Sequence, residues 1–206
     1  MTEIKAGTLT QDEKKILDSG ERRQFDSGAV RDIQEGKGRC DLLPIGEIAR
    51  YFELCNDNAE RNGLTQDDMA GILYGIDHFL FNRDESNISH SIDIFIERIF
   101  CERGKAIMEL SKHYEEGAKK YADRNWEKGI PLHCYVDSGI RHLMKFYDGW
   151  QDEPHDRAFL WNMFGLLWTF HNKPELDDLP RYCPEDNAEA VKALLESDEF
   201  NSGVTE

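Results

Sequence analysis

Three consecutive segments decide the fold: KAIMELSKHYEEGAKKYAD (105–123), VDSGIRHLMKFYDGW (136–150) and DEPHDRAFLWNMFGLLWTFH (152–171). In the first, apolar residues recur at helical spacing and predict one apolar face, made of Ile107, Leu110, Tyr114, Ala118 and Tyr121. The second repeats this spacing, and its inward-facing residues are expected to be Ile140, Leu143, Met144 and Tyr147. The third is apolar almost all round, which is typical of a central core helix.

The third segment contains three polar exceptions, His155, Asn162 and Thr169, spaced seven residues apart. They share one line of the predicted helix, beside the small residues Ala158 and Gly165. Because buried polar groups need hydrogen-bond partners, this line is the first indication of a site.

Composition restricts the function classes. The chain has 206 residues, 39% of them hydrophobic and 32% charged, with a formal net charge of -16. This balance argues against non-specific binding to nucleic acids or anionic membranes, which requires a basic surface. A nucleotide ligand remains compatible with it, because carboxylates can hold a divalent metal that brings in phosphates.

The cysteines and the apolar runs indicate the cellular compartment in which the protein is expected. Five cysteines make no CxxC pair, which indicates reduced thiols in a cytoplasmic protein. The polar start and the lack of a long apolar run predict neither a signal peptide nor a membrane span.

The rest of the chain adds further helices. Residues 1–20 resemble a polar arm or short helix, and 21–44 are expected to form an ordered, locally cationic loop. Helices are predicted at 45–55 and after Thr65, which can cap the second of them, whereas 92–100 fits either a strand or a helix. A last short helix is expected at 187–197, and the fold class is mostly α.

Two acidic clusters are candidate metal sites. Glu109, His113, Glu116 and Lys120 form a stripe that is either a metal or acid–base face or a solvated face with charge pairs. In DEPHD (152–156), Asp152 is expected to be the N-cap and Pro154 to lie in the first turn. Glu153 and Asp156, three residues apart, can hold one ion between them.

Two short motifs suggest nucleotide contacts. GKGR (36–39) places Lys37 and Arg39 on a glycine-rich turn that can wrap a phosphate, without the spacing of a P-loop. In RNW (124–126), Asn125 can read a base edge and Trp126 can stack on a base or, alternatively, cover the core.

Two residues of the second predicted helix have structural explanations of their own. Arg141 falls on a stripe with Asp137, Lys145 and Asp148, which suggests ion pairing, and His142 fits a hydrogen-bonded core histidine. His155-Asp156 is the adjacent pair used by histidine–aspartate phosphohydrolases, but a further His and Asp set is not evident.

The segments 23–44, 117–131, 137–146 and 152–162 together resemble the phage dATP/dGTP diphosphohydrolase family, which is similar to the MazG-type all-α nucleotide pyrophosphohydrolases. The resemblance covers residues 21–180 in blocks and is looser over 45–104. It implies a MazG-like helical bundle with an irregular N-terminal loop region, preceded by an arm (1–20) and followed by a tail (181–206). The MazG pattern EExxE is incomplete here, because Lys119 replaces the third acid, while Glu153 to Asp156 fits ExxD.

The resemblance also implies an activity, the hydrolysis of a deoxypurine triphosphate to monophosphate and pyrophosphate with Mg²⁺ or Mn²⁺. The implied metal ligands are Glu109, Glu116, Asp152, Glu153 and Asp156. The implied catalytic residues are Lys120, His142 and His155. The implied substrate contacts are Lys37, Arg39, Tyr121, Asn125, Trp126 and Arg141. A homo-oligomer is expected, without direct DNA, RNA or membrane binding. The alternative is a phage protein that binds and sequesters a nucleotide without turnover.

Overall fold

A computed structural model describes residues 20–55 and 60–180. Its elements are β1 (Arg22–Gln24), β2 (Val30–Asp32), η2 (Cys40–Leu42), α1 (Ile45–Leu54), α2 (Gln66–Asn82), α3 (Glu85–Ile99), α4 (Arg103–Tyr121), η3 (Asn125–Lys128), α5 (Leu132–Tyr147), α6 (His155–Asn172) and η4 (Pro174–Leu176). The predicted mostly α fold is therefore confirmed. The helical ends predicted within 1–20 and at 187–197 lie outside the described residues.

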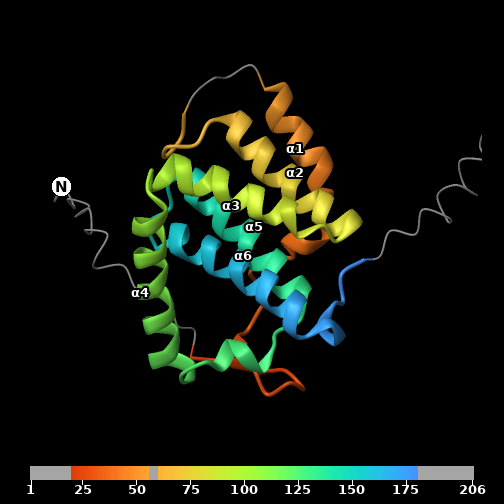
Figure 1. Cartoon of the computed structure of the whole chain (residues 1–206), viewed down its shortest axis with the longest axis vertical. Coiled ribbons are helices and arrows are strands. Elements are labelled where there is room, and N and C mark those ends of the chain that lie inside the picture. Colours follow the sequence, from red (N-terminus) through yellow and green to blue (C-terminus); the bar gives the residue numbers. More distant parts are fainter. Residues whose placement is uncertain (1–19, 56–59, 181–206) are drawn as a thin grey trace, which may run out of the picture.

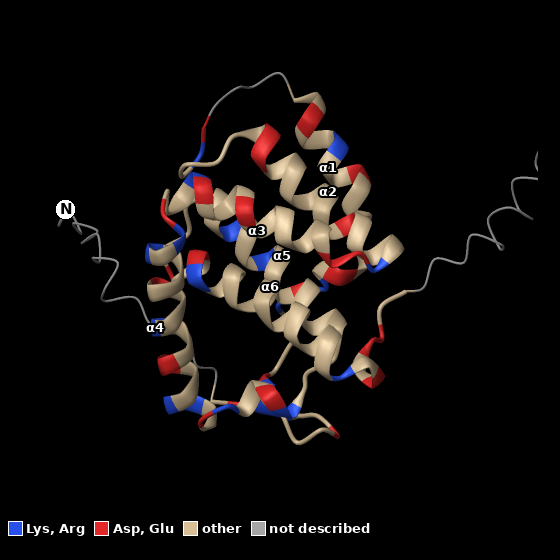
Figure 2. Cartoon of the chain, viewed as in Figure 1, with Lys and Arg blue, Asp and Glu red and all other residues tan. Residues whose placement is uncertain are grey.

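The helices α5 and α6 form the centre of the fold (Figure 1). From Ala158 to Phe170, α6 is apolar except for Asn162 and Thr169, and most of its ribbon carries no charged residue in Figure 2. The missing Cβ of Gly165 makes room for the fully buried ring of Tyr135 on α5. The other helices pack outward from this pair: α3 contacts α6, α2 contacts α3, and α1 contacts α2, while α4 packs against α6 on another side.

Local capping sets the ends of the middle helices. The hydroxyl of Thr65 accepts a hydrogen bond from Asp68 N–H, and the Asp68 carboxylate accepts one from Thr65 N–H. This capping box confirms the predicted start of α2. Asp84 caps α3 by accepting from Ser86 N–H, so that residues 92–100, compatible with strand or helix from the sequence, lie almost entirely in a helix.

The expectation of a loop for residues 21–44 is wrong at its beginning. β1 and β2 pair antiparallel, with Arg23 opposite Arg31. The turn between them closes with a hydrogen bond from Phe25 N–H to Ala29 C=O, and Gly28 has a φ of 83°, which favours glycine. Strands of three residues are too short to produce a detectable alternation, which is why the sequence did not reveal them.

The inward face of the α4 helix differs in part from the predicted one. Its buried residues are Ala106, Leu110 and His113, whereas Ile107 is 47% exposed, so the inward position predicted for Ile107 is wrong. The polar stripe of α4 therefore packs against the rest of the protein, together with part of the apolar face of this helix. None of the described helices has the length and hydropathy to span a membrane.

Candidate functional site

A cavity of about 1010 Å³ lies between the hairpin, the C-terminal half of α4, η3, α5 and α6. Its aromatic lining residues are Tyr114, Tyr121, Trp126, Trp150 and Trp161. Its charged lining differs from the composition of the chain. Six Lys or Arg and five Asp or Glu line it, against 25 and 41 in the whole sequence. The cavity therefore concentrates cationic groups within an acidic protein, as a site for an anionic aromatic ligand requires.

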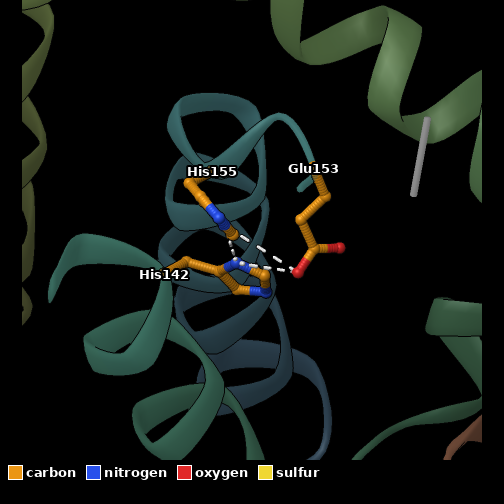
Figure 3. Close-up of side chains that lie close together, drawn as sticks. All are labelled: His142, Glu153 and His155. Carbon is orange, nitrogen blue, oxygen red and sulfur yellow. Dashed lines mark hydrogen bonds and ion pairs between the residues drawn. The ribbon is translucent and has the colours of Figure 1, made fainter. Parts of the chain in front are cut away.

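Two histidines and one carboxylate meet where α5 ends and α6 begins (Figure 3). Nδ1 of His142 lies 2.9 Å from Nδ1 of His155. Oε1 of Glu153 lies 3.6 Å from the first nitrogen and 3.8 Å from the second. Among the described residues, these three form the group whose donor atoms are close enough to hold one metal ion.

The spacing of the donor atoms fits a common ion. Two nitrogen ligands, each about 2.1 Å from an ion and at about a right angle, lie about 3 Å apart. Nitrogen–oxygen separations of 3.6 and 3.8 Å correspond at the same bond length to angles of about 120–130°. Two imidazoles with one carboxylate are a donor set that suits transition ions better than Mg²⁺.

Hydrogen bonding sets the protonation of the two histidines. Nε2 of His155 lies 2.7 Å from Oδ1 of Asp152. Because a carboxylate only accepts, His155 donates to Asp152 through Nε2–H, and its Nδ1 is the atom that faces His142. Burial, and next the neighbouring His155, lowers the pKa of His142 well below 6.5, so the His142 ring is neutral. Neutral imidazoles are the form that binds metals.

Asp152 orients this group. It does not cap α6, so the N-cap role predicted for Asp152 is wrong. The N-cap is Pro154, and no side chain caps the helix. The Asp152 carboxylate instead accepts from His155 and from Lys145 Nζ at 2.9 Å. Although burial raises its pKa, these two partners hold it below the usual value. A carboxylate behind a ligating histidine fixes the tautomer and the direction of the ring.

The structure does not bring the other predicted metal ligands to this group. Glu109 pairs with Lys112 at 2.8 Å, and Glu116 lies 3.8 Å from Arg157. Asp156 is buried and, with Glu109, lines a second cavity of about 430 Å³. Glu153 lines both cavities.

The predicted phosphate contacts separate into two sets. Lys37 and Arg141 line the large cavity, and Arg141 Nε donates to the Lys37 carbonyl at 3.0 Å while its guanidinium pairs with Asp137. Burial lowers the pKa of Lys37. Arg39 is absent from the lining and forms a two-pronged pair with Asp41.

Lys120 lies beside the cavity rather than among its lining residues. Its Nζ donates to Asp32, a lining residue, at 2.8 Å, and its side chain is nearly buried. The stripe on α4 thus reaches the cavity, and a fully solvated face is excluded for this residue.

The predicted base contacts, Tyr121, Asn125 and Trp126, all line the cavity. Asn125 Nδ2 donates to the Val30 carbonyl at 2.9 Å, and its Oδ1 accepts from Val30 N–H at 3.1 Å. The amide thereby pairs with β2 as a neighbouring strand would, which favours a role in holding the hairpin.

Several residues that line the cavity were not among the predicted site residues, and Arg31 and His113 are two of them. Arg31 extends from β2 to the space between α5 and α6, and no feature of the sequence indicated this position. His113 belonged to the polar stripe of α4, and its imidazole is 93% buried beside Trp161, with ring centroids 6.0 Å apart. Only the packing of α4 shows that the His113 side chain points inward.

Comparison with known proteins gives one family. Residues 83–179 match the family described as dATP/dGTP diphosphohydrolase, N-terminal. The match contains all of α3, α4, α5 and α6, and with them the His142–Glu153–His155 group. Neither the curated proteins nor the solved structures give a match. Residues 83–179 of the chain are therefore similar to the dATP/dGTP diphosphohydrolase N-terminal family, which supports the resemblance seen in the sequence.

Proposed function

We propose that the chain hydrolyses deoxypurine triphosphates to deoxynucleoside monophosphates and pyrophosphate in a metal-dependent reaction. One observation carries this proposal: the metal-donor group adjoins a cavity with both cationic and aromatic walls. A nucleoside triphosphate combines the matching parts, because its phosphates attract cations and metals and its base attracts aromatic groups.

The triphosphate is placed by the cations nearest to the donor group. Arg141 and Lys145 lie on α5 on either side of His142, and the hydrogen bond to the Lys37 carbonyl brings the glycine-rich turn to the same end. No described carboxylate forms an ion pair with Lys37, which leaves its ammonium available for a phosphate oxygen. These charges would neutralise the phosphates and the departing pyrophosphate.

The metal is held by His142, Glu153 and His155. For this, the Nδ1 proton of His142 must move to Nε2, and Asp152 keeps the lone pair of His155 directed at the same point. The chemistry that such an ion supplies is neutralisation of phosphate charge and activation of water. Of the two ions predicted from sequence, Mn²⁺ suits two imidazole ligands better than Mg²⁺ does.

In the proposed reaction, one water adds to a phosphorus atom and the bridging P–O bond between the α- and β-phosphates breaks. Both products leave as phosphates, and the water protons pass to product oxygens or to solvent. The aromatic walls exclude water around the base, while Trp150, beside Lys145, lies at the phosphate end with its ring centroid 4.9 Å from Nζ. The phage setting, the cytoplasmic location and self-association expected from the resemblance accompany this proposal.

The test is incubation of the full chain with each of the four dNTPs and Mn²⁺, Mg²⁺, Zn²⁺ or a chelator, with the products separated by anion-exchange chromatography. We expect monophosphate and pyrophosphate from dATP and dGTP, lost with chelator and in His142→Ala and Glu153→Gln. Glu115→Gln is the matched control, because Glu115 lines the rim of the same cavity but is exposed and pairs with Lys119.

Other outcomes assign the chain to another class. Nucleoside and triphosphate as products would indicate the histidine–aspartate chemistry. Nucleotides that bind but remain intact with every metal would indicate the sequestering protein, for which the missing third acid on α4 is the supporting observation.

A further inference from the structure

Arg31 is a cation in the cavity that has only neutral partners. Its Nη1 donates to the Cys134 carbonyl and its Nη2 to Asn162 Oδ1, each at 3.1 Å. Asn162 Nδ2 donates to the Ala158 carbonyl at 2.8 Å, which fixes the direction of the amide. No described carboxylate pairs with Arg31, and its guanidinium lies 5.3 Å from the ring centroid of Trp161. A guanidinium has five N–H donors, so donors remain for a ligand in the cavity that Arg31 lines.

Arg31 lies at the opposite end of the cavity from the metal-donor group. Its two anchors, Cys134 and Asn162, are eight and seven residues from His142 and His155 along α5 and α6. With a rise of about 1.5 Å per residue, these anchors lie roughly 10–12 Å along the helices from the two histidines. This separation is comparable with that between the base and the phosphates of a nucleotide. Since the phosphates belong at the donor group, the base reaches Arg31.

A second observation indicates a ligand at this end. Nδ1 of His113 is buried and has no hydrogen-bond partner among the described residues. His113 lines the same cavity, and Trp161 adjoins both His113 and Arg31. An unpaired polar atom in a buried position is costly, and a polar ligand would supply its partner.

We propose that Arg31 reads the O6 and N7 atoms of guanine, so that this cavity prefers guanine to adenine nucleotides. Arginine is a donor-only group, and guanine presents two acceptors on this edge. Adenine presents N7 beside a donating amino group, which opposes the guanidinium. The inference rests on the proposed function for the placement of the phosphates, and it makes Arg31 a specificity-determining residue.

Binding of monophosphates tests the proposal without any turnover. The wild-type chain with Mn²⁺ is titrated with dGMP, dAMP, dIMP and 7-deaza-dGMP by isothermal calorimetry. We expect dGMP to bind about 5- to 150-fold more tightly than dAMP, the range for one two-pronged base contact. dIMP keeps O6 and N7 and should bind like dGMP, whereas 7-deaza-dGMP lacks N7 and should bind more weakly.

Two variants assign the preference to this residue. In Arg31→Gln, the amide matches N6 and N7 of adenine, so the preference should vanish or reverse. In Arg31→Lys, the charge stays but the planar fork is lost, and the preference should fall. The matched control is Arg23→Gln on the paired strand, which lines the same cavity and should keep the wild-type ratio. Circular dichroism confirms that each variant is folded, and the wild-type series decides the question if one is not.

The inference and the proposed function fail separately. Equal affinity for dGMP and dAMP, weak binding of dIMP, or no binding of any monophosphate at millimolar concentration would overturn the base-reading role. Release of pyrophosphate from dNTPs would still support the function in each of these cases. Conversely, a guanine preference without pyrophosphate release would leave the role of Arg31 intact and refute the hydrolysis.

Discussion

Replacing His113 by phenylalanine should change how the stability of this protein depends on pH. The imidazole is 7% exposed. Burial, and next the positive charges of Arg157, Arg31 and Lys120, lowers its pKa from 6.5 to about 3. The indole of Trp161, whose ring centroid lies 6.0 Å from that of His113, carries no charge. His113 therefore stays neutral in the folded protein at pH values where the unfolded chain takes up a proton.

The sign follows from proton binding. Below pH 6.5 the unfolded state binds more protons at this residue than the folded state, so acidification destabilises the fold. This loss begins at pH 6.5 and ends near pH 3, the two pKa values of the residue. Between pH 7 and pH 5 it amounts to about 2 kcal/mol. Phenylalanine keeps an aromatic ring, removes the unpaired Nδ1 and does not titrate. Between pH 7 and pH 5, the free energy of unfolding of His113→Phe should therefore fall by about 2 kcal/mol less than that of the wild type.

The assay is urea unfolding at pH 7, 6 and 5, followed by circular dichroism, with the difference between variant and wild type taken at each pH. Parallel pH curves would refute the buried, neutral state of His113. His133 provides a control of opposite sign. Its hydrogen bond with Asp178, and next its contact with Cys134, raises its pKa to about 10. The stability it contributes is complete below pH 6.5 and is lost as the pH rises towards 10, so His133→Phe should alter the alkaline side of the curve.

Three further predictions concern the hairpin, the helix contact and the metal. Asn125→Asp should keep the hydrogen bond from Val30 N–H but set a carboxylate oxygen against the Val30 carbonyl. We expect the free energy of unfolding in urea to fall by about 1–3 kcal/mol and dGMP to bind more weakly. An unchanged unfolding midpoint would contradict the role of Asn125 in holding β2. Gly165→Ala would place a Cβ 2.4 Å from the Tyr135 ring, and we expect a loss of at least about 1–3 kcal/mol by thermal unfolding, whereas a neutral result would place the ring elsewhere. Mn²⁺ at 100 times its Kd should stabilise the wild type by about 2.7 kcal/mol, and Glu153→Gln should abolish the shift in Tm; an equal shift in the variant would exclude Glu153 as a ligand.

Helical periodicity made the fold predictable. Helices were expected where α1, α2, α4, α5 and α6 lie, and Thr65 marked the start of α2 by its local capping chemistry. These signals are local, because a helix and its cap depend on residues within a few positions of one another. The burial of His155, Asn162 and Thr169 followed from the same reasoning, and each has the hydrogen-bond partner that burial demands.

The site was less predictable, because it depends on contacts between distant residues. His142, Glu153 and His155 were all proposed as site residues, but nothing in the sequence showed that two imidazoles and a single acid would meet. Their meeting requires α5 and α6 to pack antiparallel with His142 beside His155. Of the remaining predicted acids, Asp152 bonds to His155, whereas Glu109, Glu116 and Asp156 lie outside the group of donor atoms.

The sequence by itself determined that this chain is mostly helical, where most helices lie, and which segments carry polar groups into the core. Only the tertiary structure decided which faces meet: that the α4 stripe turns inward, that three-residue strands form a hairpin, and that Arg31 reaches Asn162, 131 positions away. The physical reason is that periodicity specifies a buried face without specifying its partner. The partner follows from close packing of whole elements, such as the contact of Gly165 with Tyr135, to which residues far apart in the sequence contribute together.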